Sequence, residues 1–236
     1  MSSYKIGQID VLHQDIIRPT HGEPRSPSRT ILKPGHRRTE KNRPILVETI
    51  LESDQILTMR DGVTLRANVF RPVTDTKVPA ITMYGPYGKS GSDKFPFRVG
   101  IPESKLSGYE NFEGLDPAEW VPKQYAIINV DAGGINDSEG NVRWWDSAEG
   151  EDGHDTVEEV AKLPWCSGKV SMAGNSWLAA CQWYTAAQNP PHLACIAPME
   201  GISDPFREHM YRGGIPNTRF ATPLSESFIA KYPDNN

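Results

Sequence analysis

The chain has 236 residues, of which 37% are hydrophobic and 23% are charged, with 20 glycines and 20 prolines. This composition excludes collagen, a coiled coil and wholesale disorder. No stretch approaches the roughly 20 consecutive apolar residues of a membrane-spanning helix. The three cysteines (Cys166, Cys181 and Cys195) contain no CxxC pair, so neither a disulfide framework nor a zinc ribbon is indicated. The length fits one globular domain or the larger part of a bigger one.

Charge is unevenly distributed along the chain. The net charge is −5, yet residues 1–43 carry nine Lys and Arg side chains against four Asp and Glu. This basic, proline-rich arm is either a poorly ordered leader or a segment that lies on the domain surface. Because it supplies no groove-reading helix and no stacking platform, we expect no nucleic-acid binding. The first residues lack the apolar core of a secretory signal, so we expect a cytoplasmic protein without membrane contact.

The first predicted elements are strands. Residues 45–59 and 63–70 flank a turn at Arg60-Asp61-Gly62 and predict an antiparallel hairpin with one buried face. The apolar runs 78–84 and 125–131 predict two strands buried on both faces. Between them, residues 87–117 are rich in Gly, Ser and Pro and predict a long surface excursion.

The following elements alternate between helix and strand. A helix is predicted over 151–163, with Asp152 and Asp155 in its first turn. The remaining elements are a short strand over 169–173, a helix over 177–188 and a buried strand over 193–198. This alternation implies βαβ units. The expected fold class is α/β, with a mostly parallel sheet and an antiparallel N-terminal hairpin at its edge.

The segment Val170–Ala180 carries the chemistry. A buried strand runs through Gly174-Asn175-Ser176 directly into a helix, which is the context that a nucleophile elbow requires. Such a turn presents the Ser176 hydroxyl above the carboxyl end of the sheet and needs small neighbours such as Gly174. The common pattern has a second glycine where this chain has Leu178. The same residues also fit a plain strand-to-helix turn.

Two groups are placed to stabilise an oxyanion beside Ser176. The backbone N–H of Trp177 lies at a helix N-terminus, where it can donate to developing negative charge. Tyr87 follows the 78–84 strand and therefore lies at the same edge of the sheet. From composition alone, Tyr87 fits equally well as a rim aromatic that packs on its loop.

Four segments, in order, resemble the X-prolyl dipeptidyl-peptidase and cocaine-esterase family of α/β-hydrolases (CocE/NonD, peptidase S15-like). They are Met59–Leu65 with Phe70-Arg71-Pro72, Gly85–Lys89, Asp137–Gly140 before Glu149 and Asp152-Gly153, and Pro164–Val170 leading into the elbow. Pro190–Leu193 and Ile196-Ala197-Pro198 continue the match, which spans roughly residues 44–212. The resemblance implies a partial α/β-hydrolase domain over 44–200 and the start of a cap or linker over 201–236.

The resemblance also implies residue roles. Ser176 is the expected nucleophile, with the Trp177 N–H and the Tyr87 phenol as oxyanion donors. The chain departs from the family in two places. The family usually has Tyr where this chain has Trp177, and it commonly has arginines after the equivalent of Asp131, where this chain has Ala132-Gly133-Gly134. Those arginines hold the loop in the family, so the sequence does not decide whether this loop is ordered.

A serine nucleophile needs a histidine base that an acid orients. In the family both follow an inserted cap, and a β-sandwich comes later, so we expect them beyond Asn236 and expect the chain alone to be weakly active or inactive. The histidines within this chain are weaker candidates for the general base. His192 should lie at the opposite edge of the sheet from Ser176, and His154 opens a helix, where packing or capping explains it. Asp204 and His209 emerge at the catalytic edge and are a conceivable improvised pair.

Other clusters do not require a ligand. Asp152, His154 and Asp155 fit a solvated helix start better than a metal site, so no metal and no cofactor are expected. Trp144-Trp145 fits loop packing or a substrate wall. The leading hypothesis is a serine hydrolase that acts on a small ester or amide, including a prolyl peptide or an acyl ester, through an acyl-enzyme. The alternative is a non-catalytic remnant or interaction module whose open sheet edge is covered by a partner chain or a second copy.

Overall fold

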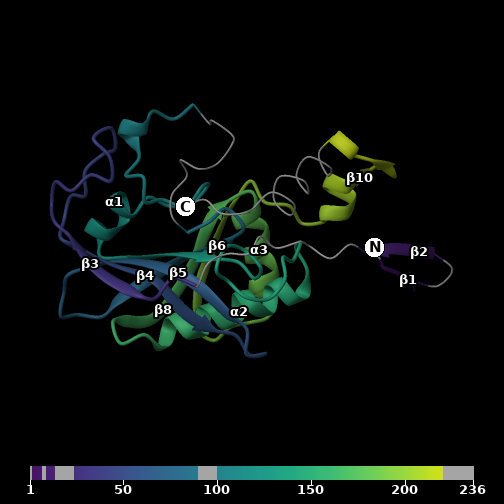
Figure 1. Cartoon of the computed structure of the whole chain (residues 1–236), viewed down its shortest axis with the longest axis horizontal. Helices are drawn as coiled ribbons and strands as arrows, with labels where there is room; N and C mark the ends of the chain where they lie inside the picture. Colours follow the sequence, from purple (N-terminus) through teal and green to yellow (C-terminus); the bar gives the residue numbers. More distant parts are fainter. Residues whose placement is uncertain (1, 7–8, 14–23, 90–99, 220–236) are drawn as a thin grey trace.

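The computed structural model describes residues 2–6, 9–13, 24–89 and 100–219. Its centre is a seven-stranded mixed sheet with the strand order β3-β4-β5-β7-β6-β8-β9 (Figure 1). The strands are β3 (Ser28–Leu32), β4 (Thr49–Thr58), β5 (Thr64–Pro72), β6 (Val78–Gly85), β7 (Ala126–Asp131), β8 (Cys166–Asn175) and β9 (Leu193–Met199). The pairs from β3 to β7 are antiparallel, whereas β7, β6, β8 and β9 run parallel. The expected α/β class is confirmed.

The helices are α1 (Pro117–Trp120), α2 (Ser147–Lys162) and α3 (Trp177–Ala187), with short helical turns η1 (Glu103–Lys105), η2 (Val121–Lys123) and η3 (Phe206–Met210). Two small hairpins, β1 (Ser2–Ile6) with β2 (Ile9–His13) and β10 (Tyr211–Arg212) with β11 (Ile215–Pro216), are separate from the main sheet. Both lie to one side of it in Figure 1. No helix in the described ranges has the length and apolar character needed to cross a membrane.

The predicted N-terminal hairpin is present as β4 and β5, although its first strand begins at Thr49 rather than at residue 45 and its second continues to Pro72. A bulge interrupts the β4–β5 register between Glu52 and Gln55. Asp54 lies within this bulge with a φ of 56°, and its backbone N–H donates to Asn68 Oδ1 at 3.0 Å. The bulge turns the Asp54 side chain toward the catalytic edge of the sheet, where it takes part in an ion cluster described below.

The sheet begins earlier in the chain than the sequence suggested. Residues 28–32 fall within the basic arm, for which the sequence predicts no strand, but they form β3 and pair antiparallel with β4. The segment Ser28–Leu32 has no alternation of apolar and polar residues that would indicate a strand, and it becomes one by pairing with β4. Much of the remaining arm, including residues 14–23, lies outside the described residues.

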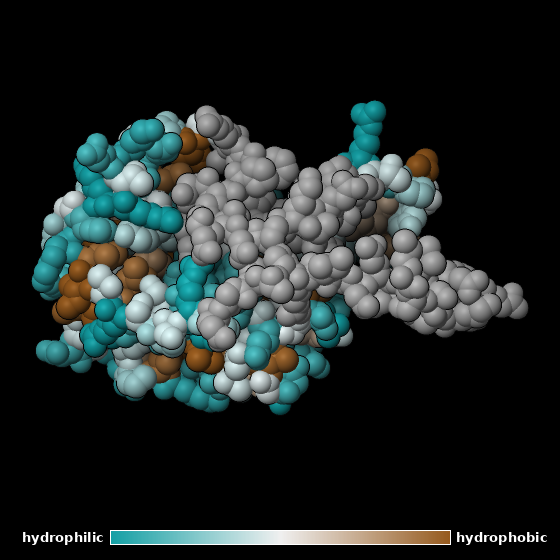
Figure 2. Space-filling view, viewed as in Figure 1, coloured by the Kyte–Doolittle hydropathy of each residue, from teal (hydrophilic) through white to brown (hydrophobic). Residues whose placement is uncertain are grey.

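The sheet has an apolar core on each face. The side chains of β6 point to both faces of the sheet: Ala80 and Tyr84 belong to the core on one face, and Ile81 and Met83 belong to the core on the other. Val157 of α2 completes the first core. The second contains side chains from α3 and from the connection before β7. Exposed apolar groups lie in separate patches between hydrophilic ones on the face seen in Figure 2.

Two predictions about helix and loop boundaries were wrong. Helix α2 begins at Ser147 rather than at 151, because the Asp146 side chain caps it by accepting from the Glu149 N–H at 2.8 Å. Asp152 and Asp155 therefore lie beyond the first turn. The predicted surface excursion also contains a buried part, since residues 107–112 pack under the sheet edge, with Phe112 in the second core. Residues 90–99 of that excursion lie outside the described part.

Strand β9 was expected to be buried, and the structure corrects this. It pairs with β8 and has no further neighbour among the described residues, so it forms an edge of the sheet. Ala194, Cys195, Ala197 and Met199 are exposed. The apolar run correctly predicted a strand, but a run of apolar residues does not reveal whether a neighbouring strand covers it.

Candidate active site

Ser176 lies in a strained turn between β8 and α3. Its φ of 55° and ψ of −115° fall in a region that residues other than glycine rarely adopt. The turn is held on both sides: the Ser176 N–H donates to the Met199 carbonyl at 3.0 Å, and the Ala180 N–H donates to the Ser176 carbonyl at 2.9 Å. This strand–turn–helix geometry is that of a nucleophile elbow.

Leu178 occupies the place of the second glycine of the common pattern, and two glycines make room for it. A Cβ atom on Gly174, whose φ is 143°, would lie 2.4 Å from Leu178 Cβ. A Cβ atom on Gly85 would lie 2.4 Å from Leu178 Cδ2. Because Gly85 on β6 and Gly174 on β8 have no side chains, they leave room for Leu178. The leucine in place of the second glycine therefore does not disrupt the turn.

Tyr87 is brought to Ser176, as expected. Its ring packs edge-on against Phe112, with 5.2 Å between ring centroids. Its phenol oxygen interacts with the Ser176 hydroxyl and with the backbone N–H of Trp177. Burial and the nearby carboxyl of Glu113 raise the pKa of the phenol well above its usual value, so Tyr87 keeps its proton. The structure thus brings together the three residues that the sequence singled out.

Glu113 is a site residue that the sequence did not reveal. Its carboxyl group accepts from Asn175 Nδ2 at 3.2 Å, and its carbonyl accepts from the Asn175 N–H at 2.9 Å. Partial burial raises the pKa of Glu113, while its interactions with Tyr87, Asn175 and Ser176 oppose that rise. The residue comes from a glycine-containing loop far from the elbow in sequence. Its φ of 61° is the only local peculiarity, and a single sequence does not show it.

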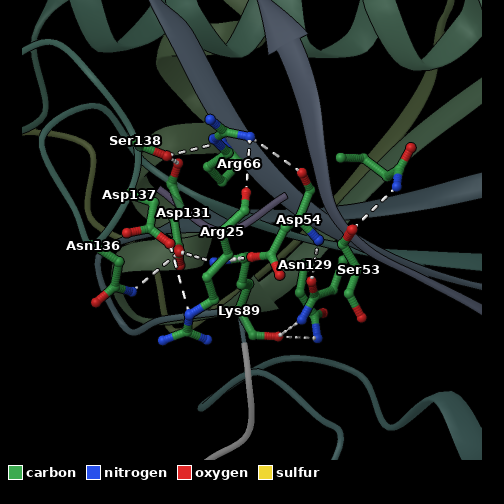
Figure 3. Close-up of polar contacts among 12 residues, drawn as sticks. Arg25, Ser53, Asp54, Arg66, Lys89, Asn129, Asp131, Asn136, Asp137 and Ser138 are labelled. Carbon is green, nitrogen blue, oxygen red and sulfur yellow. Dashed lines mark hydrogen bonds and ion pairs between the residues drawn. The ribbon is translucent and has the colours of Figure 1, made fainter. Parts of the chain in front are cut away.

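A buried ion cluster anchors the loop that carries Tyr87 (Figure 3). Lys89 Nζ lies 3.0 Å from Asp131 Oδ2 at the end of β7 and 3.1 Å from Asp54 Oδ1 in the β4 bulge. The Lys89 carbonyl accepts from Asn68 Nδ2 at 3.1 Å and from Asn129 Nδ2 at 3.4 Å. Both the side chain and the backbone of Lys89 are therefore fixed to neighbouring strands.

The loop after β7 is ordered without the arginines that the family commonly has. Asn136 Nδ2 donates to Asp131 Oδ2 at 3.1 Å, and the Ser138 hydroxyl donates to the Asp131 carbonyl at 2.8 Å. The Gly134 N–H donates to the Glu139 carbonyl at 2.8 Å. A Cβ atom on Gly134 would lie 2.6 Å from the Val142 nitrogen, so the glycine permits a close backbone approach there. These contacts hold the loop in place of the arginines, so the loop is ordered.

The Trp177 side chain is buried among other indoles. Its ring centroid lies 5.2 Å from that of Trp144 and 4.8 Å from that of Trp145. Trp177 Nε1–H donates to Glu149 Oε1 at 2.8 Å. Of the two interpretations of Trp144-Trp145, loop packing is the one that these contacts with Trp177 describe.

The local substitutes for a base are engaged elsewhere. His192 Nδ1 lies 2.7 Å from Glu158 Oε2, before β9 and thus at the amino end of the parallel strands. His154 Nδ1 lies 3.0 Å from Asp155 Oδ1, and the Asp155 carboxylate binds Arg60. The His192 pair therefore lies at the opposite edge of the sheet from Ser176, and the His154 pair is held by Arg60 in the turn between β4 and β5.

The conceivable pair of Asp204 and His209 does not form. The Asp204 carboxylate binds the Arg207 guanidinium at 2.6 Å and the Arg207 N–H at 2.9 Å, so it caps the turn η3. The His209 ring packs near Trp145, with 6.4 Å between centroids, and burial lowers its pKa. Among the described residues, no group of three or more His, Cys, Asp or Glu side chains is arranged to hold a metal ion.

The sheet order, the strained serine turn between β8 and α3, and the tyrosine after β6 together define an incomplete fold of the α/β-hydrolase type. Comparison with known proteins makes the assignment more specific. Residues 61–231 match the family described as X-Pro dipeptidyl-peptidase (S15 family). The chain belongs to this family.

Individual relatives agree with the family. Cocaine esterase from a Rhodococcus species is 31% identical over 162 residues, which are 69% of this chain and 25% of that protein. A CocE/NonD family hydrolase from Staphylococcus aureus superimposes with a TM-score of 0.71 at 35% identity, over 79% of this chain and 34% of its own. An α-amino acid ester hydrolase shares the fold with a TM-score of 0.60 at 21% identity. The chain therefore spans about a quarter to a third of the length of these proteins.

Proposed function

We propose that the chain carries the nucleophile half of a serine hydrolase that acts on esters or amides. The observation that supports this most is the convergence of the strained Ser176, the Tyr87 phenol and the Trp177 N–H at the carboxyl edge of the sheet. In the proposed reaction, Ser176 Oγ attacks the substrate carbonyl carbon, and the Trp177 N–H and Tyr87 O–H donate to the oxyanion.

The chemistry then follows the course of acyl transfer. The Ser176 proton passes to a general base and from it to the leaving alcohol or amine, which leaves an acyl-enzyme. Water attacks this intermediate, returns a proton to Ser176 and releases the acid. The names of the family and of cocaine esterase suggest two substrate classes, prolyl peptides and acyl esters. Within the residues described, the Asp204 carboxylate binds Arg207 and so is not free to orient His209 as a base, and we therefore expect slow turnover by this chain alone.

A fluorophosphonate probe tests the nucleophile directly. We expect a covalent adduct on Ser176, located by peptide mass spectrometry, and its loss in Ser176→Ala. Ser171→Ala, on the same strand, is the matched control and should label like the unaltered chain. A folded protein that acquires no adduct, or one that labels equally after Ser176→Ala, contradicts the proposal.

The exposed edge of β9 favours a second candidate, an interaction module. Parallel edge strands are usually covered, and exposed apolar residues on β9 would be shielded by a partner chain or a second copy. Size-exclusion chromatography with light scattering distinguishes a monomer from an oligomer. A stable oligomer that dissociates after Ala197→Lys supports the module, whereas a monomer that remains soluble at high concentration contradicts it.

A further inference from the structure

Glu149 is a buried carboxyl group on α2 that faces two hydrogen-bond donors. It is 1% exposed. Oε1 accepts from Trp177 Nε1–H at 2.8 Å, and Oε2 accepts from the Trp145 backbone N–H at 2.7 Å. In the part of the chain that the structure describes, no lysine, arginine or histidine appears among the groups that contact it or shift its pKa. A buried carboxyl group satisfied by two N–H donors and no cation is uncommon, because isolation from water disfavours its charge.

The two donors belong to the surroundings of the nucleophile. Trp177 follows Ser176, and the same residue presents its backbone N–H to the Tyr87 phenol and its indole N–H to Glu149. The residue is 2% exposed, so its ring has little freedom beyond the contacts that hold it. A change in the position of the indole therefore changes the first turn of α3, where the oxyanion donor lies.

The charge state of Glu149 decides how many of these bonds it accepts. A carboxylate offers both oxygens as acceptors, whereas a carboxylic acid keeps one acceptor and gains a donor. With an N–H facing each oxygen, protonation costs one of the two bonds. Burial raises the pKa of Glu149 to about 8, and the bonds from Trp177 and Trp145 oppose the rise. The group therefore changes its charge near neutral pH.

The groups that face Glu149 reinforce this behaviour. Asp146 and Asp152 lie on the same helix and raise its pKa by charge repulsion. Tyr84 on β6 and Cys181 and Tyr184 on α3 also face it, and burial together with the charge of Glu149 raises the pKa of each, so all three keep their protons. The groups around Glu149 are thus acids and neutral side chains, and none of them stabilises its negative charge as a cation would.

We propose that Glu149 is a positioning residue for the nucleophile turn. In its ionised form it holds the Trp177 indole and the Trp145 backbone, and so keeps the Trp177 N–H directed at the place where the oxyanion forms. This inference rests on the proposed function, in which Ser176 is the nucleophile. Glu149 touches neither the serine nor the substrate, and its action passes entirely through Trp177.

The first test does not depend on catalysis. In protein labelled with ¹⁵N-tryptophan, the Trp177 Nε1–H resonance is assigned by its loss in Trp177→Phe. We expect this resonance to shift with a midpoint near pH 8, and to stay at its low-pH position throughout in Glu149→Gln, because glutamine also offers one acceptor oxygen. Glu151→Gln, an exposed residue on the same helix, should keep the titration. A resonance that does not titrate, or that titrates unchanged in Glu149→Gln, overturns the inference.

The second test measures the rate of fluorophosphonate labelling of Ser176 against pH. The ratio of unaltered to Glu149→Gln rates should rise about tenfold as Glu149 ionises, the factor that corresponds to one charge-assisted hydrogen bond. In the Trp177→Phe background, Glu149→Gln should change the rate much less. A flat ratio in a chain that labels overturns the inference. If no variant labels, the proposed function fails, and the indole titration alone decides whether Glu149 holds Trp177.

Discussion

The ammonium group of Lys89 lies 3.0 Å from the carboxylate of Asp131, whose side chain is 0% exposed. Asp54 lies 3.1 Å away on the other side, so one cation neutralises two buried anions. Lys89→Met would leave both carboxylates buried without a counter-ion. We expect a loss of about 3–5 kcal/mol in the free energy of unfolding, measured by urea unfolding followed by circular dichroism.

An exposed ion pair provides the matched control for Lys89. Lys123 lies 2.8 Å from Glu119, and both side chains are about half exposed. Lys123→Met should therefore cost less than about 1 kcal/mol. Adding Asp131→Asn to Lys89→Met should restore part of the lost stability. A Lys89→Met protein as stable as Lys123→Met would show that the buried cluster is not needed to hold the loop.

Tyr87→Phe should slow fluorophosphonate labelling of Ser176 by roughly 100-fold, the cost of removing one oxyanion donor. The phenylalanine ring can keep the edge-on packing against Phe112, so the thermal unfolding midpoint should change little. Tyr109→Phe is the control, because its hydroxyl interacts with His36 instead. Equal labelling by Tyr87→Phe and the unaltered chain would return Tyr87 to the role of a rim aromatic.

Glu113→Gln should accelerate labelling of Ser176. The Glu113 carboxylate lies beside the position where negative charge develops in the transition state, so removing its charge favours that state by up to roughly tenfold. Because partial burial raises the pKa of Glu113, the gain should shrink as pH falls and the carboxyl takes up its proton. Labelling rates measured against pH check this, and slower labelling at every pH would instead assign Glu113 a supporting role.

Gly174→Ala should strongly destabilise the elbow. The new methyl group would lie 2.4 Å from Leu178 Cβ at a φ of 143°, so both contact and backbone strain oppose it. We expect a cost of about 2–4 kcal/mol, of which Leu178→Ala in the same chain should restore a part. At Gly62, with a φ of 86° and no atom within 4 Å of a Cβ, alanine should cost only about 1 kcal/mol. Equal costs at both positions would contradict the close packing of Leu178.

The pH dependence of stability should report Glu149. Its pKa in the folded protein, about 8, lies above the unfolded value near 4.5, so the folded state binds the extra proton between these limits. Its contribution to stability is therefore complete below about pH 4.5 and is lost as pH rises to about 8. Asp152, with a pKa of about 6, acts in the same direction over a narrower range. The difference between the unaltered chain and Glu149→Gln isolates the Glu149 contribution, and a difference independent of pH would contradict a raised pKa.

Local patterns were sufficient for much of the fold and for the position of Ser176 in the turn between strand and helix. The turn at Arg60-Asp61-Gly62, the apolar runs of β6 and β7, and the strand–serine–helix pattern around Ser176 each lie within a short stretch of chain. Their information is local: backbone conformation, alternation of side chains and the need for small residues at a tight turn.

Other features depended on contacts between distant parts of the chain. Glu113 reaches Asn175 across 62 positions, and Glu149 reaches Trp177 across 28. Neither contact has a signature in its own stretch of sequence. The exposure of β9 and the start of α2 at Ser147 were misjudged for a similar reason, since an apolar run does not identify its neighbours and a capping aspartate is recognised only when its partner N–H is known.

The sequence by itself therefore determined the α/β class, the family and the serine at the elbow, because these depend on patterns that neighbouring residues carry together. Only the tertiary structure decided which carboxyl groups surround that serine and in which charge state. Burial and the distance between charges set those states, and both arise when segments far apart in the chain are packed against one another. The contacts of Lys89 with Asp54 and Asp131, of Glu113 with Asn175 and of Glu149 with Trp177 each join segments that the sequence alone does not bring together.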